Sequence, residues 1–212
     1  MGALYSKKPV IYGLNINTFV FDEKRVDTMP PERAQKIRSF RFADDRKRSL
    51  AAGLLLEAAL GREALFGIRR RGGGRPYLDG GPYFSISHSG DWAALAVCEE
   101  NAGFDIELVR ADRDTALIAR HAFQPEEIEA VGRDVKMFYR VWTARESYLK
   151  MVGGPPVKMT DFCVQLADGA GRIKGGGGES VRFFEQFDGY AAAVCSPAGL
   201  DWPREITALT GI

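Results

Sequence analysis

Two acidic residues near the middle of the chain alternate along a segment that predicts a β-strand. Asp105 and Glu107 lie within residues 102–108 (AGFDIEL), and side chains at alternate strand positions project from one face. Both carboxylates therefore share a face, while Ile106 points the other way into the core. An isolated pair of this kind is usually the polar face of a half-solvated strand, so its meaning depends on the partners it meets.

A third carboxylate belongs to a predicted long helix at residues 134–152. Trp142, Glu146 and Lys150 follow one another at intervals of four and form one stripe along it. The ordinary alternative is a surface Glu–Lys pair worth about 0.2–0.5 kcal/mol. That alternative fits poorly with Trp142 and Leu149, which favour burial. A helix packed on the sheet would hold Glu146 at the rim of the contact.

If Glu146 faces Asp105 and Glu107, three carboxylates converge and repel one another. At ~4 Å each pair costs about 1 kcal/mol in water and several times more near a protein surface. A cation removes this penalty, and a set of oxygen ligands selects a hard ion, Mg²⁺ or Mn²⁺. Because Mg²⁺ keeps positions open for phosphate oxygens, the pattern predicts a polyphosphate ligand, with Lys150 able to neutralise a nearby phosphate.

Basic and hydroxyl side chains in the first half of the chain suit the rest of a phosphorylated ligand. These residues are Arg33 and Lys36 on one predicted helix face, Arg75 after a glycine run, and Ser87 and His88 in a serine-rich strand. Such groups bind phosphomonoesters or an adenine nucleotide. Each signal alone also fits a solvated helix face or a structural histidine. The sequence has neither GxGxxG nor GxxxxGK[ST], so Rossmann and P-loop nucleotide binding are unsupported.

The composition is that of an ordinary globular protein. The 212 residues are 45% hydrophobic and 27% charged, with a net charge of +1, which gives no electrostatic signature of nucleic-acid binding. No run of 18 apolar residues exists, so no membrane span is expected. The cysteines are odd in number and widely spaced: Cys98, Cys163 and Cys195. This argues against a disulfide framework or a zinc site. They favour a reducing compartment, and we expect a cytoplasmic protein.

Apolar periodicity and turn residues predict a mixture of helices and strands. Helices are expected at 31–42, 44–60, 112–122, 125–131 and 134–152, and strands at 9–21, 82–88, 92–98, 102–108, 160–166, 180–187 and 189–195. Glycine runs predict turns at 72–74, 80–81 and 175–178, and residues 153–156 (GGPP) end the long helix. Without regular βαβ alternation, this order indicates an α+β fold rather than a doubly wound sheet.

A weak internal similarity divides the chain in two. DWAALAVC at 91–98 resembles DGYAAAVC at 188–195, and each would be the last strand of its half. The similarity suggests a duplicated α/β unit with halves at residues 1–103 and 104–212. The alternative is a pair of unrelated alanine-rich core strands.

Several motifs occur together in the chain. They are SISHS at 85–89, GFDIE at 103–107, WTARESYLK at 142–150, GRP at 74–76 and the basic region at 31–48. In this order they resemble the signatures of 4′-phosphopantetheinyl transferases, of the longer, monomeric, surfactin-synthetase-activating type. The resemblance covers most of the chain from about residue 30 to 165, and the combination is far more specific than any single motif.

The resemblance implies a pseudo-two-fold arrangement of the two halves, with coenzyme A in the cleft between them. It implies Mg²⁺ held by Asp105, Glu107 and Glu146, and the pyrophosphate bound by Lys150. The remaining implied contacts are His88, with Arg33, Lys36 and Ser87, at the 3′-phosphate, and Gly74, Arg75 and Pro76 at the adenine. Glu127 is implied as a secondary base or metal-shell residue, in competition with Glu146.

Two positions depart from the family pattern. Arg145 stands where many members have lysine, which keeps the charge but changes the geometry. Residues 151–160 (MVGGPPVKMT) replace a G-x-G-L turn followed by Pro-Leu, which affects the expected shape of the loop that faces pantetheine and the carrier protein.

The implied reaction is transfer of 4′-phosphopantetheine from coenzyme A to a serine of an apo acyl or peptidyl carrier protein, by a monomer. Two alternatives remain open at this point. One is a Mg²⁺-dependent nucleotide phosphohydrolase, which needs no acceptor protein. The other is a non-catalytic coenzyme A-binding module.

Overall fold

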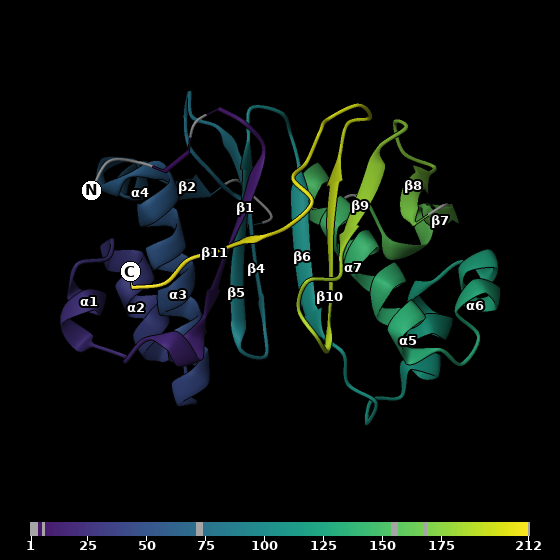
Figure 1. Cartoon of the computed structure of the whole chain (residues 1–212), viewed down its shortest axis with the longest axis horizontal. Coiled ribbons are helices and arrows are strands. Elements are labelled where there is room, and N and C mark those ends of the chain that lie inside the picture. Colours follow the sequence, from purple (N-terminus) through teal and green to yellow (C-terminus); the bar gives the residue numbers. More distant parts are fainter. Residues whose placement is uncertain (1–3, 6, 71–73, 154–156, 168, 212) are drawn as a thin grey trace.

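Within the residues that the structure describes, the strands build three sheets, of four, five and two strands. The four-stranded and five-stranded sheets face each other across the middle of the molecule, with helices on the outer sides (Figure 1). The computed structural model describes residues 4–5, 7–70, 74–153, 157–167 and 169–211. The mixed content confirms the α+β prediction. The pseudo-two-fold relation between the halves stays a prediction, as do the boundaries at 1–103 and 104–212.

The first sheet has the strand order β11-β1-β5-β4, with β4 at the edge nearest the second sheet. Strands β4 and β5 form a hairpin in which Ser87 lies opposite Ala94 and Ser89 opposite Trp92. The elements of this part are β1 (Val10–Asn15), η1 (Ile16–Thr18), α1 (Glu23–Asp27), α2 (Pro31–Ser39), α3 (Ala43–Leu60), α4 (Arg62–Gly67), β2 (Arg69–Arg70), β3 (Pro76–Tyr77), β4 (Tyr83–Ser89) and β5 (Trp92–Cys98).

The second sheet has the strand order β6-β10-β9-β8-β7, so that β6 is also an edge strand. Asp105 lies opposite Ala193 and Glu107 opposite Ala191 on β10. The elements are β6 (Gly103–Leu108), α5 (Thr115–Ala122), α6 (Pro125–Val131), α7 (Val135–Val152), η2 (Met159–Asp161), β7 (Cys163–Ala167), β8 (Ala170–Lys174), β9 (Ser180–Phe184), β10 (Tyr190–Ser196) and β11 (Thr207–Ala208).

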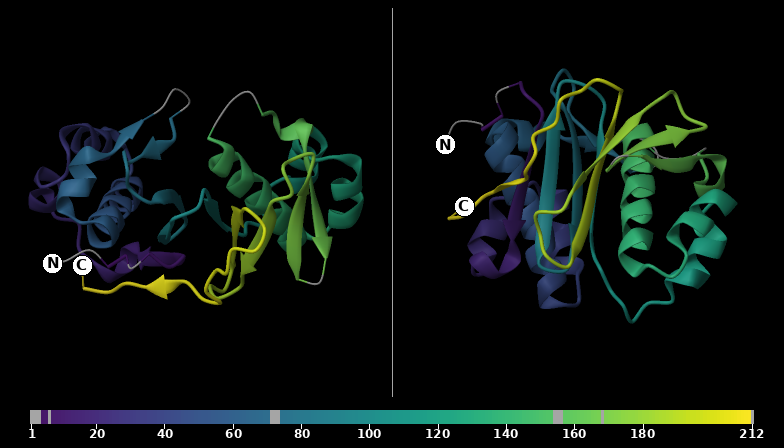
Figure 2. Two further views of the ribbon diagram at one scale, coloured as in Figure 1. Left: turned by 90° about the horizontal axis from the view of Figure 1, so that it is seen from above. Right: turned by 45° about the vertical axis from the view of Figure 1, so that its right-hand side comes forward.

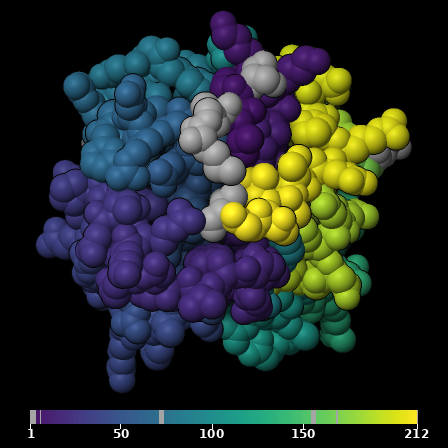
Figure 3. Space-filling model, turned by 60° about the vertical axis from the view of Figure 1, so that its left-hand side comes forward, coloured from purple at the N-terminus to yellow at the C-terminus, as the bar shows by residue number. Residues whose placement is uncertain are grey.

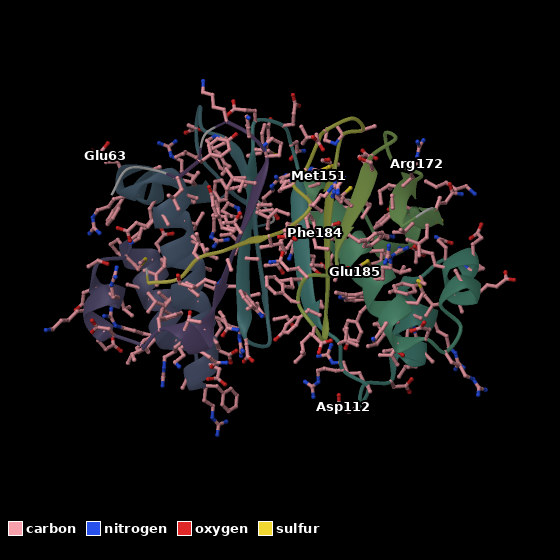
Figure 4. All side chains as sticks on the ribbon, in the orientation of Figure 1. Glu63, Asp112, Met151, Arg172, Phe184 and Glu185 are labelled. Carbon is pink, nitrogen blue, oxygen red and sulfur yellow. The ribbon has the colours of Figure 1, made fainter. Side chains whose placement is uncertain are left out.

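Three apolar clusters hold this arrangement together. One packs α3 against the first sheet, and a second packs α7 against the second sheet. The third joins the sheets to each other and includes Ile11, Phe104 and Phe184, the last labelled near the centre of Figure 4. Burial of apolar area is the main stabilising term in folding, so the seam between the sheets is itself part of the core.

The C-terminal segment returns to the first sheet. Strand β11 pairs in parallel with β1, with Thr207 opposite Tyr12. Figure 2 shows this crossing from above, and Figure 3 shows the end of the chain on the surface beside the N-terminal segment. The amide of Gln186 bonds both the backbone N–H and the carbonyl oxygen of Ile206, which fixes the segment where it leaves the second sheet.

Several elements differ from their predicted bounds. The strand expected at 9–21 stops at Asn15, because the Asn15 side chain accepts a hydrogen bond from the N–H of Asn17 at 2.8 Å and starts a 3-10 turn. Helices α1 and α4 and strands β2, β8 and β11 were not predicted; most are too short to show a periodic signal. Because β11 follows β10, β10 is not the last strand of its half.

The long helix ends where predicted. Gly153 follows Val152 with a φ of +85°, a conformation that glycine adopts without steric cost. Gly154, Pro155 and Pro156 lie outside the described residues. Among the described residues, no helix is both long and apolar enough to cross a membrane, and the three cysteines are buried and free.

Candidate active site

A cavity of about 610 Å³ opens between the two halves. Helix α2 and strands β2 and β4 contribute its basic wall, and β6 and α7 contribute its acidic wall. The predicted site residues that line it are Arg33, Lys36, Gly74, Arg75, Pro76, Ser87, His88, Asp105, Glu107, Glu146 and Lys150, joined by Trp142. The structure thus brings together every predicted site residue except Glu127.

The acidic wall depends on an unusually close approach of β6 to α7. A Cβ atom at Gly103 would lie 2.0 Å from the carbonyl oxygen of Ser147 and 2.4 Å from the backbone nitrogen of Met151. Only glycine leaves room for this contact. The absence of a side chain at Gly103 therefore sets the start of β6 against the last turns of α7, where Glu146 and Lys150 lie.

Asp105 is the most deeply buried of the acidic residues. Its side chain is 3% exposed and its Oδ1 atom accepts hydrogen bonds from Ser87 Oγ at 2.7 Å and Lys150 Nζ at 2.6 Å. Its Oδ2 atom is buried and has no hydrogen-bond partner within the described part of the chain. A buried oxygen of this kind is costly unless a ligand satisfies it.

The other two carboxylates are half-buried and repelled by Asp105. Burial raises the pKa of Glu107, and the charge of Asp105 raises it further, against a hydrogen bond from Ser89 that lowers it. Burial and then Asp105 also raise the pKa of Glu146, against the opposing effect of Lys150. Both shifts mean that added positive charge at this wall would be stabilising.

The donor set fits a hard divalent ion. All three side chains offer oxygen, one of them a buried atom without a partner, which is the chemistry that Mg²⁺ and Mn²⁺ select. The carboxylates are not drawn into a compact cluster: within the described residues no group of three His, Cys, Asp or Glu side chains has the spacing of a formed metal site. The Lys150 ammonium lies against Asp105 instead and supplies the positive charge.

Three cations face one another on the basic wall. Burial and the neighbouring Arg70 lower the pKa of Arg33 to about 10, and burial, Arg70 and Arg33 lower that of Lys36. Cations that repel one another in a cavity favour an anion between them. Arg70 was missed in the sequence, because a two-residue strand shows no alternation that would assign its face.

His88 belongs to the same wall. Part of its surface is open to solvent, but the surrounding cavity limits its hydration and lowers its pKa, and the charges of Lys150, Arg48 and Lys36 lower it further. An imidazole held neutral by cations gains a proton when an anion arrives. This is the electrostatic behaviour expected of a phosphate-binding histidine.

Arg75 links the cavity to the seam. Its guanidinium donates to the carbonyl oxygen of Ala102 at 2.9 Å, to Asn101 Oδ1 at 2.8 Å, and to the carbonyl oxygen of Met151. Met151 is labelled in Figure 4 at the end of α7. Arg75 therefore holds the ends of β6 and α7 together while it lines the cavity beside Gly74 and Pro76.

Glu127 lies away from the cavity, in the core of the second half. It forms a buried ion pair with Arg145, accepts the N–H of Val164 at 2.7 Å, and closes a capping box with Gln124 at the start of α6. Arg145 in turn lies 4.4 Å from the centre of the Phe162 ring and donates to the carbonyl oxygen of Met159. These contacts give Glu127 a structural environment, and we assign it no proton transfer.

Two family models match the chain in succession. Residues 22–100 match the N-terminal model of 4′-phosphopantetheinyl transferases, and residues 101–202 match the 4′-phosphopantetheinyl transferase superfamily. The chain is 35% identical over 168 residues to a Haemophilus influenzae protein described under the same family name, covering 72% of this chain and 71% of that protein. It is 28% identical over 217 residues to the 4′-phosphopantetheinyl transferase Sfp of Bacillus subtilis, covering 93% and 96% of the two chains.

A further Bacillus subtilis 4′-phosphopantetheinyl transferase is 28% identical over 194 residues, 82% of this chain and 85% of that one. The matches span both walls of the cavity. Together with the order of the motifs, they show that this chain belongs to the 4′-phosphopantetheinyl transferase superfamily, as an enzyme of the Sfp type.

Proposed function

We propose that the chain transfers 4′-phosphopantetheine from coenzyme A to a serine hydroxyl of an apo acyl or peptidyl carrier protein, with Mg²⁺, and releases adenosine 3′,5′-bisphosphate. The observation that carries this proposal is one cavity with a basic wall and an acidic wall. Coenzyme A carries a 3′-phosphomonoester and a pyrophosphate, and the two walls suit these groups separately.

The basic wall is proposed to hold the 3′-phosphate. Arg33, Lys36 and Arg70 supply positive charge that repels itself in the free enzyme, His88 adds a ring nitrogen, and Ser87 lines the same wall. Charge-assisted hydrogen bonds to phosphate are the strongest that such side chains make. Gly74, Arg75 and Pro76 would line the adenine, since they occupy the same side of the cavity.

The acidic wall is proposed to serve the reacting end of the substrate. Asp105, Glu107 and Glu146 would hold a Mg²⁺ or Mn²⁺ ion, which when bound neutralises charge that develops on the phosphates. Lys150 would leave its contact with Asp105 and bind a pyrophosphate oxygen. Charge stabilisation of this kind is usually the largest contribution to phosphoryl transfer.

The bond changes are those of a single displacement. The serine oxygen attacks the phosphorus nearer pantetheine, and the bond from that phosphorus to the bridging oxygen breaks, so that the bridging oxygen leaves with adenosine 3′,5′-bisphosphate. Glu146 is proposed to accept the serine proton. The proton passes to Glu146 directly or through a water molecule beside it, because a carboxylate that also holds a cation is a weaker base.

The reaction is proposed to occur in the cytoplasm and to need one copy of the chain. The cavity is lined by both halves of a single chain, which supports a monomer. Three buried free cysteines are consistent with a reducing compartment.

Intact-mass spectrometry of several apo carrier proteins, incubated with the enzyme, coenzyme A and Mg²⁺, tests the proposal. We expect a gain of one phosphopantetheine group on at least one carrier, lost when the target serine is replaced by alanine. Steady cleavage of coenzyme A without any carrier would favour a phosphohydrolase. Tight coenzyme A binding without transfer to any carrier would favour a binding module. Either result would overturn the proposal.

A further inference from the structure

We propose that Ser87 and Ser89 of strand β4 are positioning residues for Asp105 and Glu107 of strand β6, so that the N-terminal half orients the metal ligands of the C-terminal half. The inference rests on the proposed function, because it concerns the same acidic wall. It adds a role for Ser89 and a second role for Ser87, neither of which follows from binding of the substrate.

The seam between the sheets is bridged by side chains. Strands β4 and β6 are the edge strands of two separate sheets, and they lie side by side in Figures 1 and 2. Ser85, Ser87 and Ser89 occupy alternate positions of β4 and therefore share a face. All three hydroxyls reach β6, so the serines form a ladder between edges that would otherwise leave polar groups unpaired.

The first rung of the ladder serves only the backbone. Ser85 Oγ accepts the N–H of Phe104 at 2.9 Å and lies 3.4 Å from the carbonyl oxygen of the same residue. Ser85 is buried, and its contacts explain how the edge of β6 is held without a neighbouring strand. Among the described residues, both hydrogen bonds of the Ser85 hydroxyl go to Phe104 and neither goes to a carboxylate.

The other two rungs reach the carboxylates themselves. Ser87 Oγ donates to Asp105 Oδ1 at 2.7 Å and accepts from Lys150 Nζ at 2.9 Å. Ser89 Oγ donates to Glu107 Oε2 at 2.7 Å and accepts the N–H of Leu108 at 3.0 Å. In the free enzyme the accepted bond fixes each hydroxyl, and the donated bond then has one direction available. The bond that fixes Ser89 comes from the backbone and does not depend on the position of Lys150.

These contacts set the orientation of the carboxylates. Because Ser87 and Lys150 both bind Oδ1 of Asp105, the buried Oδ2 atom is the one left for a ligand. Ser89 holds Oε2 of Glu107. A glutamate side chain has more torsional freedom than an aspartate side chain, so its orientation depends more on such a contact. Groups that orient metal ligands in this way typically contribute 10- to 100-fold to metal affinity.

Ser89 offers the cleaner test, because Ser87 contacts Lys150, which is itself proposed to bind the substrate, whereas Ser89 accepts its bond from the backbone. The variants are Ser89→Ala, Ser89→Thr, which keeps the hydroxyl, and Ser85→Ala, the matched control from the same ladder. Mn²⁺ is the probe, and its dissociation constant is measured by calorimetric titration of each full-length protein. Thermal unfolding and the KM for coenzyme A at saturating Mn²⁺ are measured alongside.

We expect Ser89→Ala to weaken Mn²⁺ binding about 10-fold or more, in the range typical of such contacts. Its KM for coenzyme A at saturating Mn²⁺ should stay within about twofold of wild type, because the contact acts on the metal ligand. Ser89→Thr should restore most of the affinity. Ser85→Ala should lower the unfolding temperature and keep Mn²⁺ affinity within about twofold of wild type.

Equal Mn²⁺ affinity in Ser89→Ala and wild type would overturn the inference and leave the proposed function standing. An equal loss in Ser85→Ala and Ser89→Ala would also overturn it, because the ladder would then act only on overall stability. If Ser89→Ala does not fold, Ser89→Thr still decides. This variant keeps the hydroxyl, so a loss of Mn²⁺ affinity of about 10-fold in Ser89→Thr would contradict a role for the hydroxyl. Failure of the wild-type protein to bind Mn²⁺ would overturn both this inference and the proposed metal dependence.

Discussion

Lys150 Nζ lies 2.6 Å from Asp105 Oδ1, so the buried carboxylate of the acidic wall is paired with a cation of the chain itself. The Lys150 side chain is 30% exposed, whereas that of Asp105 is 3% exposed. Lysine can therefore leave this contact for solvent or for a phosphate, and Asp105 cannot. The ion pair offsets part of the cost of burying Asp105 beside two other acidic side chains.

Asp105→Ala is expected to lower the rate of transfer at least about a hundredfold and to leave the protein folded. The fold should survive because Lys150 can rehydrate and because the mutation removes a charge that repels Glu107 and Glu146. Transfer is followed by carrier mass, and folding by circular dichroism. Asp112→Ala, which removes an exposed partner of Arg110 (Asp112 is labelled in Figure 4), is the matched control. Retained Mg²⁺-dependent turnover in Asp105→Ala would remove Asp105 from the mechanism.

His88 is expected to make stability fall at acid pH. Its pKa is lowered from 6.5 in the folded protein, first by burial in the cavity, so the unfolded chain binds the proton more readily. The stabilising contribution is present above pH 6.5 and is lost as the pH falls through the folded pKa. Urea unfolding between about pH 7 and 5 should therefore show a smaller pH dependence in His88→Gln than in wild type.

Coenzyme A should oppose this loss, because an anion beside His88 favours the protonated ring. His121→Gln replaces the other histidine, which is exposed on α5, and serves as the control. Wild type and His88→Gln with identical pH dependence would contradict the electrostatic description of the basic wall.

Arg70 and Arg69 offer a direct test of the 3′-phosphate site. The two residues are neighbours on β2, but Arg70 lines the cavity, whereas Arg69 forms an exposed ion pair with Asp79. Arg70→Ala should weaken coenzyme A binding about 10-fold, the effect of one charge-assisted hydrogen bond. It should barely affect 3′-dephospho-coenzyme A, and Arg69→Ala should affect neither. Calorimetry with both ligands measures the difference. An equal loss of affinity for both ligands would mean that Arg70 contacts a part of coenzyme A other than the 3′-phosphate.

The buried pair of Glu127 and Arg145 is expected to be structural. Glu127→Ala should lower the free energy of unfolding by about 3–5 kcal/mol, because it leaves Arg145 charged and unpaired in the core. Replacing Arg145 by methionine as well should recover part of this loss, as a double-mutant cycle in urea would show. Below the unfolding temperature, turnover per folded molecule should be retained. A well-folded Glu127→Ala protein without turnover would restore Glu127 as a candidate base.

The sequence was informative where function demands residues at fixed spacing. The alternation of Asp105 and Glu107 and the four-residue interval between Glu146 and Lys150 follow from strand and helix geometry, and the structure places all four at one cavity. Residue types alone suggested the basic side chains as phosphate-binding groups, and the resemblance to a family supplied the cleft and the part of the substrate that each residue would contact.

Tertiary contacts account for what the sequence did not predict. Nothing local marks Gly103 as the point where β6 meets the backbone of α7, or Ser85, Ser87 and Ser89 as a ladder to another sheet. Glu127 is of a residue type that acts in many active sites. Its ion pair with Arg145, which is distant in sequence, holds it in the core of the second half instead. Strand β11 is two residues long and is defined only by its pairing with β1.

In the proposed site the acidic wall holds a divalent ion against the pyrophosphate, at a distance from the 3′-phosphate. Phosphorus NMR of coenzyme A, with substoichiometric Mn²⁺ and excess enzyme, distinguishes this arrangement from others, because Mn²⁺ broadens the nearest phosphorus resonances. We predict strong broadening of both pyrophosphate signals, much weaker broadening of the 3′-phosphate signal, and loss of this pattern in Asp105→Ala. Equal broadening of all three signals, or the same pattern in Asp105→Ala, would contradict the account.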